Sequence, residues 1–366
     1  INETPKSADI VIIGGGPAGT AALWALERNA PNIKAVLIEQ GDTLGSGAST
    51  ASIENFRTAW PIESIARAVS RSVEIFTHAD EYLGEGASRS LNVKQHGYLY
   101  CGFNQREVDC LKSEVESLKR TGFSHIEFLD RDEVVYRYPW LGCNVVAAKV
   151  DPHAGWLDSN SLINLFVKST KKADVLTGVT ESKIIVENGK IVGVKIPNGL
   201  IKTEKVVIAA GGQSKSVAEI AGIHLPIVMR PRQSFVTTFR HIEFPTNAPF
   251  IIGSHPTAYT RPAGETGAIF GWAYKIHTGV RYPGTEDYMP QSVWPTWKLI
   301  DPRFPSMTLM ELAKQFGHKD GRGFANTNYL RGVKVQAGYY VYRDPSTTFA
   351  QNLKGEWIHS DSERPI

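Results

Sequence analysis

Three glycines near the amino terminus, Gly14, Gly16 and Gly19, follow an apolar run at 10–13 and precede an alanine-rich stretch. Strand, turn and helix in this order form a phosphate site when the glycines have these spacings. Gly14 permits the tight turn, Gly16 lets the backbone approach a pyrophosphate, and Gly19 lets the helix pack against the strand. The N-terminus of the helix then faces the phosphates with free N–H groups. The spacing predicts that this turn binds a dinucleotide.

An acidic residue follows at the end of the second predicted strand. Glu39 comes twenty positions after Gly19 and directly after the apolar run 36–38. A carboxylate at this place accepts hydrogen bonds from both hydroxyls of a ribose, and it would repel a 2′-phosphate. Residues 9–40 therefore predict a β-α-β unit that holds a nucleotide with an unphosphorylated ribose.

Two later stretches of small residues are placed to face the same nucleotide. Residues 45–50 combine glycine with serine and threonine, whose hydroxyls donate to phosphate oxygens. The predicted strand 206–210 ends in Gly211 and Gly212, where the absent side chains let the backbone press against a flat cofactor. Taken alone, the first stretch also fits an ordinary surface loop, and the second also fits a buried strand before a tight turn.

Composition and charge narrow the class of protein. The chain has 366 residues, 42% of them hydrophobic and 21% charged, with a net charge of +3, as in an ordinary globular protein of two or more domains. The charges are interspersed, so no nucleic-acid partner is implied. Cysteines 101, 110 and 143 lack C-x-x-C spacing, which predicts reduced thiols. The apolar runs are too short to span a bilayer and no signal peptide is visible, so we expect a cytoplasmic protein, with peripheral attachment to a membrane as the alternative.

The sequence predicts no metal site. Neither the cysteines nor the histidines have metal-ligand spacing, and the histidines are interpreted as structural or solvated. The histidines considered are His96, His153, His255 and His277.

The remaining pattern predicts helices, hairpins and an interrupted nucleotide-binding unit. Apolar residues recur at helical spacing in several segments, and Asn-Gly pairs at 188–189 and 198–199 mark hairpin turns. Helices are expected over 62–77, 107–120, 158–170 and near 306–317, and strands over 97–100, 176–179, 182–186, 191–196, 205–210 and 234–239.

The ordered set of motifs resembles the D-amino-acid oxidase superfamily of FAD-dependent oxidoreductases, most closely its glycine/sarcosine oxidase and dye-linked L-proline dehydrogenase branch. The motifs that carry the resemblance are 14–19 with Glu39, 47–49, Asp158, the hairpin region at Val179, 206–212, 259–262, 267–271 and 337–340. By this resemblance the cofactor is FAD, Val179 contacts the adenine through its backbone, and the α-hydrogen of an amine passes to flavin N5 as a hydride. The same fingerprint also fits NAD, but the small residues at 211–212 favour FAD.

The resemblance implies a discontinuous Rossmann-like α/β domain that binds FAD, together with an α+β substrate domain built on a large mixed or antiparallel sheet. We expect the FAD-binding domain at 1–60, 155–225 and 345–366, and the substrate-binding domain at 61–154 and 226–344. The candidate cofactor residues are Ile13, Gly14, Gly16, Pro17, Ala18, Gly19, Glu39, Gln40, Ser46, Gly47, Ala48, Ser49, Thr50, Val179, Ala210, Gly211, Gly212 and Gln213.

Four residues are candidates for the catalytic site: Arg57, Tyr259, Arg261 and Tyr340. Arginine suits bidentate binding of a carboxylate, and either arginine also fits a purely structural role. The tyrosines, and Tyr274 with them, fit a substrate pocket or a hydrophobic core in which the hydroxyl is hydrogen-bonded.

The chain departs from the branch it resembles at three places. Ile269 stands where the oxidases carry a lysine that promotes reaction with oxygen, and isoleucine cannot stabilise developing superoxide. Ala337 stands where a cysteine links the flavin, so FAD should be non-covalent. Tyr339 and Tyr340 follow Gly338 where the amino-acid oxidases carry a carboxylate-binding arginine. In addition, 364–366 lies about where the family begins a last strand, so the sequence is either truncated or differently organised there.

The sequence thus predicts an FAD-dependent dehydrogenase for a secondary amine or imino acid, with L-proline or an N-methyl amino acid such as sarcosine as substrate. The electrons would pass to a separate acceptor: a quinone, a dye or a partner subunit in a hetero- or homo-oligomer. Two alternatives stay open. One is a D-amino-acid or glycine oxidase that produces peroxide, and the other is a non-catalytic FAD-bound assembly factor.

Overall fold

The computed structural model describes residues 4–60, 62–254, 257–272, 300–343, 350–351 and 357–358. Its nucleotide-binding sheet has four parallel strands in the order β12-β1-β2-β8. Helix α1 connects the two central strands, as the sequence predicts. The bounds are β1 (Ile10–Ile13), α1 (Pro17–Asn29), β2 (Ala35–Ile38), β8 (Asp174–Leu176) and β12 (Val206–Ile208).

Both faces of this sheet are covered, which explains why β1 and β2 are continuous apolar runs. On one face, Ile12 and Leu37 pack against Leu23 of α1. On the other face, Val11 and Val36 pack against a three-stranded antiparallel sheet. That sheet contains β9 (Lys183–Glu187), β10 (Lys190–Ile196) and β11 (Gly199–Lys202), and Asn188 and Gly189 form the predicted hairpin turn with φ of 51° and 74°.

The second body is an eight-stranded mixed sheet in the order β17-β13-β16-β15-β14-β4-β6-β5, in which β14 and β4 are parallel neighbours. Helix α9 covers it, and Phe304 and Phe316 from that helix join the main core with Phe235 and Phe270. The bounds are β4 (Tyr98–Gly102), β5 (Glu127–Leu129), β6 (Ala147–Asp151), β13 (Ile227–Thr237), β14 (Phe250–Ile252), β15 (Ala258–Ala263), β16 (Gly267–Trp272), β17 (Lys334–Arg343) and α9 (Phe304–Phe316). This architecture confirms the expected fold class.

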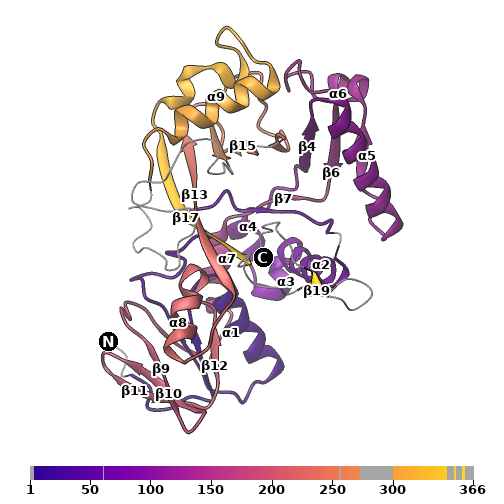
Figure 1. The fold of residues 1–366 in the computed structure, drawn as a ribbon. Coiled ribbons are helices and arrows are strands. Elements are labelled where there is room, and N and C mark those ends of the chain that lie inside the picture. Colours follow the sequence, from indigo (N-terminus) through magenta and orange to yellow (C-terminus); the bar gives the residue numbers. More distant parts are fainter. Residues whose placement is uncertain are drawn as a thin grey trace.

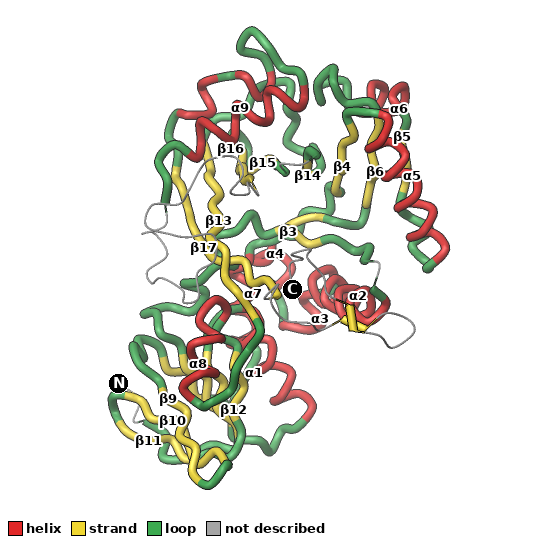
Figure 2. The backbone as a smooth tube through the Cα atoms, viewed as in Figure 1, coloured by secondary structure: helices red, strands yellow, loops and turns green. Residues whose placement is uncertain are grey.

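Two long strands connect the bodies. Strands β13 and β17 pair over ten residues and run from beside α8 towards the region under α9 (Figures 1 and 2). We expected a strand over 234–239, after Pro231, but β13 already begins at Ile227. Pro231 is tolerated because that half of the strand is paired with β17 alone, so the missing N–H breaks no second ladder.

The remaining elements lie between and around the two sheets. They are α2 (Glu63–Thr77), α3 (Ala79–Leu83), α4 (Ala87–Leu91), α5 (Gln105–Arg120), α6 (Arg131–Arg137), α7 (Ser159–Lys168) and α8 (Ser214–Ile220), the short strands β3 (Asn55–Phe56), β7 (Gly155–Trp156), β18 (Ala350–Gln351) and β19 (Trp357–Ile358), and the 3-10 helices η1 (Gly211–Gln213), η4 (Gly323–Ala325) and η5 (Thr327–Leu330). Asp158 caps α7 by accepting from the Ser161 N–H at 2.6 Å.

The sheets suggest how the chain divides into domains. All strands of the nucleotide-binding sheet fall within 1–60 and 155–225, and all strands of the large sheet within 61–154 and 226–344. Helices α2–α4 nevertheless pack on α1 and α7, because their apolar faces form one cluster with Trp24 and Phe166. We therefore propose the predicted bounds with 63–91 added to the FAD-binding side. Most of 345–366 lies outside the described residues.

Candidate cofactor and substrate site

A cavity of about 530 Å³ opens at the carboxyl ends of β1, β2 and β12, beside the loop that follows β2. It brings together every predicted cofactor residue except Gly19 and Thr50. The lining residues are Ile13, Gly14, Gly16, Pro17, Ala18, Ile38, Glu39, Gln40, Gly45, Ser46, Gly47, Ala48, Ser49, Val179, Ser182, Ile208, Ala209, Ala210, Gly211, Gly212, Gln213, Ser214, Val217, Ile227, Tyr339 and Val341.

The glycines of the turn have different tasks. Gly14 has φ of 117°, and an added Cβ would lie 2.6 Å from the carbonyl carbon of Ala209. A Cβ on Gly19 would overlap the Gly14 carbonyl oxygen, so this residue permits helix packing although it does not line the cavity. Gly16 and Gly47 do line it, and no atom lies within 4 Å of a Cβ built on either.

These open positions form a cradle that fits a dinucleotide. Helix α1 begins at Pro17 without a side-chain cap, so its first N–H groups face the cavity beside Gly16. A pyrophosphate can therefore approach the backbone at Gly16 and Gly47, where any side chain would intrude. Residues 14–19 and 46–49 would hold its phosphates.

Glu39 is fixed at the edge of this cradle. Its carboxylate accepts hydrogen bonds from the Gly15 N–H at 2.6 Å, the Gly41 N–H at 2.7 Å and the Ser46 hydroxyl at 3.1 Å. A Cβ on Gly15 would lie 2.9 Å from the carboxylate, so the motif needs this third glycine as well. The orientation of Glu39 is thus set by the protein, and a ribose would bind to its remaining lone pairs.

Two predicted cofactor residues act differently from expectation. The Thr50 hydroxyl donates to the carbonyls of Gly45 and Gly47, so it folds the loop and does not line the cavity. The Val179 N–H donates to the Glu39 carbonyl at 3.0 Å, which leaves only the Val179 carbonyl for an adenine.

Sequence reasoning missed part of the lining. Ile38, Gly45, Ile208 and Ala209 directly adjoin predicted residues, so the motifs themselves could have indicated them. Nothing local marks the others, which reach the cavity only because α8, β13 and β17 pack beside it. These are Ser182, Ser214, Val217, Ile227, Tyr339 and Val341.

Arg57 lies within a group of four tyrosines, here called the tyrosine cluster: Tyr98, Tyr100, Tyr259 and Tyr340. Its Nη1 donates to the Tyr100 hydroxyl at 3.1 Å, and its guanidinium lies 3.8 Å over the Trp60 ring. Tyr98 and Tyr100 stack at 4.8 Å, and Tyr259 is hydrogen-bonded to Tyr340.

The tyrosine cluster adjoins the loop that lines the nucleotide cavity. Tyr259 and Tyr340 line a small space together with Ala48 and Gly338, and a Cβ on Gly338 would lie 2.9 Å from Ala48. The structure therefore brings together three predicted catalytic residues, Arg57, Tyr259 and Tyr340. Tyr98 and Tyr100 were recognised only as a strand, and Tyr274, His255 and His277 lie outside the described residues.

The charges in this group suit an anionic ligand. Burial lowers the pKa of Arg57, but Tyr100, Tyr98 and Tyr340 outweigh this effect, so the pKa is raised and the guanidinium stays cationic. Burial raises the pKa of Tyr98 well above its usual value, so that phenol stays protonated. A cation beside a protonated hydroxyl can bind and orient a carboxylate.

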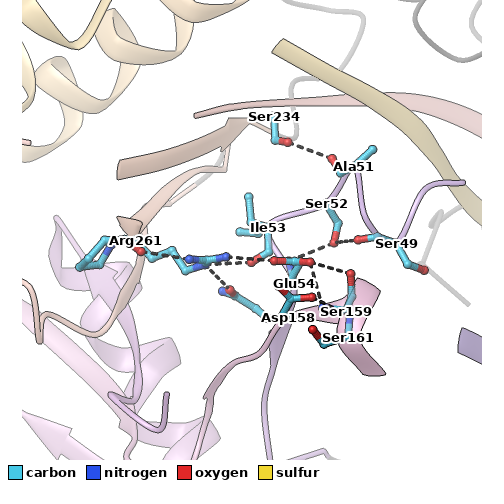
Figure 3. A network of polar contacts seen from close by, with 12 residues as sticks. Ser49, Ala51, Ser52, Ile53, Glu54, Asp158, Ser159, Ser161, Ser234 and Arg261 are labelled. Carbon is cyan, nitrogen blue, oxygen red and sulfur yellow. Dashed lines mark hydrogen bonds and ion pairs between the residues drawn. The ribbon is translucent and has the colours of Figure 1, made fainter. Parts of the chain in front are cut away.

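Arg261 serves a different network (Figure 3). It is 6% exposed, and its Nε donates to the carbonyl of Ile53 at 2.9 Å and to Asn55 Oδ1 at 3.2 Å. Its Nη2 lies 3.7 Å from Glu54 Oε2, and burial lowers its pKa to about 10. The Glu54 carboxylate in turn accepts from the N–H and hydroxyl of Ser159 at 3.0 and 2.6 Å.

Arg261 lies in a different cavity from the tyrosine cluster. This second cavity, of about 690 Å³, also contains His96, Lys94 and Ile269. Arg261 holds the segment 53–55, immediately before Arg57, to the large sheet, and this geometry favours a structural task. Among the described residues, no three His, Cys, Asp or Glu side chains are grouped to hold a metal ion.

Gly16→Ala and Gly19→Ala are expected to have opposite effects. At Gly16 the new methyl group enters open space where the phosphates would lie, so the FAD dissociation constant should rise at least ~10-fold while the apoprotein keeps its melting temperature. At Gly19 the methyl group overlaps the turn, so the apoprotein itself should be destabilised. Flavin fluorescence titration and thermal unfolding distinguish the two; equal FAD affinity for Gly16→Ala and wild type would contradict this account of the cradle.

Arg261→Met is expected to lower the free energy of unfolding by about 2 kcal/mol, because the carbonyl of Ile53 and the Glu54 carboxylate lose a charged donor. Urea unfolding of the apoprotein measures this. Arg261→Lys is the control that keeps the charge but loses the planar set of donors. A tenfold weaker affinity for substrate at unchanged stability would instead place Arg261 at the substrate.

Comparisons with known proteins agree with the cradle. Residues 9–316 match the family model described as FAD dependent oxidoreductase. The beta subunit of sarcosine oxidase from Arthrobacter sp is 25% identical over 76% of this chain and 68% of its own length. FAD-dependent oxidoreductase domain-containing protein 1 from Xenopus laevis is 24% identical over 60% and 49%, and an opine oxidase subunit from Rhizobium meliloti is 24% identical over 63% and 63%. The matches thus span between about half and two thirds of these relatives.

Solved structures share the fold. L-proline dehydrogenase from P. horikoshii superposes with a TM-score of 0.74 at 24% identity, over 94% of this chain and 84% of that one. Glycine oxidase from Geobacillus kaustophilus gives 0.72 at 16% identity, over 96% and 87%. In the part of the chain that the structure describes, no helix has the length and apolar character needed to cross a membrane. The family match, the fold and the cradle lead to one conclusion: the chain belongs to the DAO family of FAD-dependent oxidoreductases.

Proposed function

We propose that this oxidoreductase oxidises the C–N bond of a secondary amine or imino acid, with L-proline or an N-methyl amino acid such as sarcosine as substrate. The observation that carries the proposal is the position of Arg57. A cationic guanidinium lies among protonated tyrosines, beside the small space where Ala48 of the nucleotide loop meets Gly338. This position suits an amino acid held by its carboxylate next to the cofactor.

The chain's own residues would orient the substrate. Arg57 binds the carboxylate, and Tyr100, already hydrogen-bonded to Arg57, fixes the direction of the guanidinium. Tyr259 and Tyr340 limit the space on the other side. When bound, FAD supplies the hydride acceptor that this oxidation requires. No side-chain base is needed if the amine arrives neutral.

The names of similar proteins support the substrate class. Relatives are named for sarcosine and for opines, and a protein of the same fold is named for L-proline. Two of them are named as subunits, which supports the proposal that a partner subunit, quinone or dye takes the electrons. The buried Ala337 has no nucleophile to link a flavin, which supports non-covalent FAD.

Ile269 supports an acceptor other than oxygen. It is a buried residue of β16 and lines the second cavity. At this position the chain provides no positive charge that would stabilise superoxide as it forms.

The test of the proposed function is anaerobic bleaching of the flavin absorbance by L-proline, sarcosine, glycine and D-alanine, followed by air. L-Proline or sarcosine should bleach it, and the colour should return slowly in air. Arg57→Met should raise the amine concentration for half-maximal bleaching at least ~10-fold, since it removes a charged hydrogen bond of roughly 1.5–3 kcal/mol. Fast recolouring with peroxide would indicate an oxidase, and no bleaching by any amine would indicate the non-catalytic alternative.

Ile269→Lys tests the choice of acceptor. The cavity beside residue 269 offers room for the longer side chain, and its ammonium group should speed the reaction of the reduced flavin with oxygen at least ~10-fold through electrostatic stabilisation. Stopped-flow mixing of reduced protein with oxygenated buffer gives the rate. Ile269→Met, of similar length but uncharged, is the matched control, and equal rates for the two variants would refute the role given to Ile269.

A further inference from the structure

A buried carboxylate holds the residues immediately after Arg57. Asp151, the last residue of β6, is 3% exposed. Its Oδ2 accepts hydrogen bonds from the N–H groups of Thr58 at 2.8 Å and Ala59 at 3.3 Å. Its Oδ1 accepts from the Thr58 hydroxyl at 2.8 Å and the His153 N–H at 3.2 Å. One carboxylate thus receives four donors, two of them from consecutive backbone positions.

The pairing of strands connects this contact to the tyrosine cluster. In the large sheet Asp151 of β6 lies opposite Tyr98 of β4, and Tyr100 lies two residues further along β4. Tyr100 takes the side chain of Arg57, and Asp151 takes the backbone and hydroxyl of Thr58. Two adjacent strands therefore grip two consecutive residues. The direction in which Arg57 leaves the backbone is set by the second grip.

A histidine completes the contact. His125 Nε2 lies 2.9 Å from the Thr58 hydroxyl oxygen and 3.7 Å from Asp151 Oδ1. Because the Thr58 hydroxyl donates its hydrogen to Asp151, its oxygen must accept from the His125 Nε2–H. The His125 ring stacks on His153 at 4.2 Å. Burial and His153 lower the pKa of His125 and Asp151 opposes them, so the ring is neutral at pH 7 with its proton on Nε2.

We propose that Asp151 is a positioning residue for Arg57, acting through Thr58 with His125 as the supporting donor. The proposal rests on the proposed function, since it takes Arg57 to bind the substrate carboxylate. The charge of Asp151 matters because an asparagine offers one acceptor oxygen and turns an NH₂ group towards N–H and O–H donors. Without the carboxylate, residues 58–59 lose their hold on β6, and Arg57 loses its fixed direction.

The first measurement is hydrogen exchange, which needs no substrate. In FAD-loaded Asp151→Asn, the backbone N–H groups of residues 58–59 should exchange at least ~10-fold faster than in wild type, because they lose their acceptor. The rest of β4 should be unchanged. Asp130→Asn is the matched control: Asp130 caps α6 by accepting from the Glu133 N–H, and asparagine caps equally well. Unchanged exchange at 58–59 in Asp151→Asn would overturn the proposal.

The second measurement is ligand affinity. Pyrrole-2-carboxylate, a planar analogue of proline, is titrated against the visible flavin spectrum. Asp151→Asn and Thr58→Val should raise its dissociation constant at least ~10-fold, and Thr58→Ser, which keeps the hydroxyl, should restore wild-type affinity. The amine concentration for half-maximal bleaching should rise in parallel, whereas the bleaching rate at saturating amine should change less than ~3-fold. Thr58→Val keeps the test valid if Asp151→Asn does not fold.

The outcomes separate this proposal from the proposed function. If wild-type protein is bleached by an amine and Thr58→Val binds pyrrole-2-carboxylate as tightly as wild type, the positioning role is wrong. If wild type neither binds the probe nor is bleached by any amine, the proposed function fails, and hydrogen exchange at residues 58–59 alone decides the role of Asp151.

Discussion

The structure depends on one close approach, between the turn after β1 and the end of β12. The Gly14 N–H donates to the Ile38 carbonyl and the Ala209 N–H to the Ile13 carbonyl, each at 2.8 Å. Three parallel strands thereby end at the same edge of the sheet with almost no side chains between them. The nucleotide cavity exists because this edge is bare, and Gly16 stands in it as an open position. A ligand that binds there is held by backbone groups, which cannot swing away.

The loop from 46 to 60 carries this fixed edge into the substrate site. It is fastened at successive points to elements of both bodies. Ala48 lies against Gly338 of β17, Glu54 is hydrogen-bonded to Ser159 of α7, and β3 pairs with β7. Glu54 has φ of 59°, an unusual conformation for a residue with a side chain, and the contacts on both sides of it explain why it persists. The substrate residues are therefore positioned relative to the cofactor through a loop with little freedom.

Two arginines of the same site show how surroundings decide the task of a side chain. Arg57 meets hydroxyls and an aromatic face and keeps its charge available, with a raised pKa. Arg261 is almost fully buried and donates to carbonyls of its own chain, and its pKa falls to about 10. The first arrangement leaves the guanidinium able to accept an incoming carboxylate. The second consumes its donors in holding the fold together.

The sequence by itself determined the local parts of this protein: the glycine turn with Glu39, the hairpin at 188–189 and the cap at Asp158. These depend on contacts within a few residues or on one strand–turn–helix unit, whose spacing is visible along the chain. Only the tertiary structure decided that Arg57 meets Tyr100 and that Asp151 holds Thr58. Those residues lie 43 and 93 positions apart, and their meeting depends on the register of β4 and β6, which no local periodicity encodes.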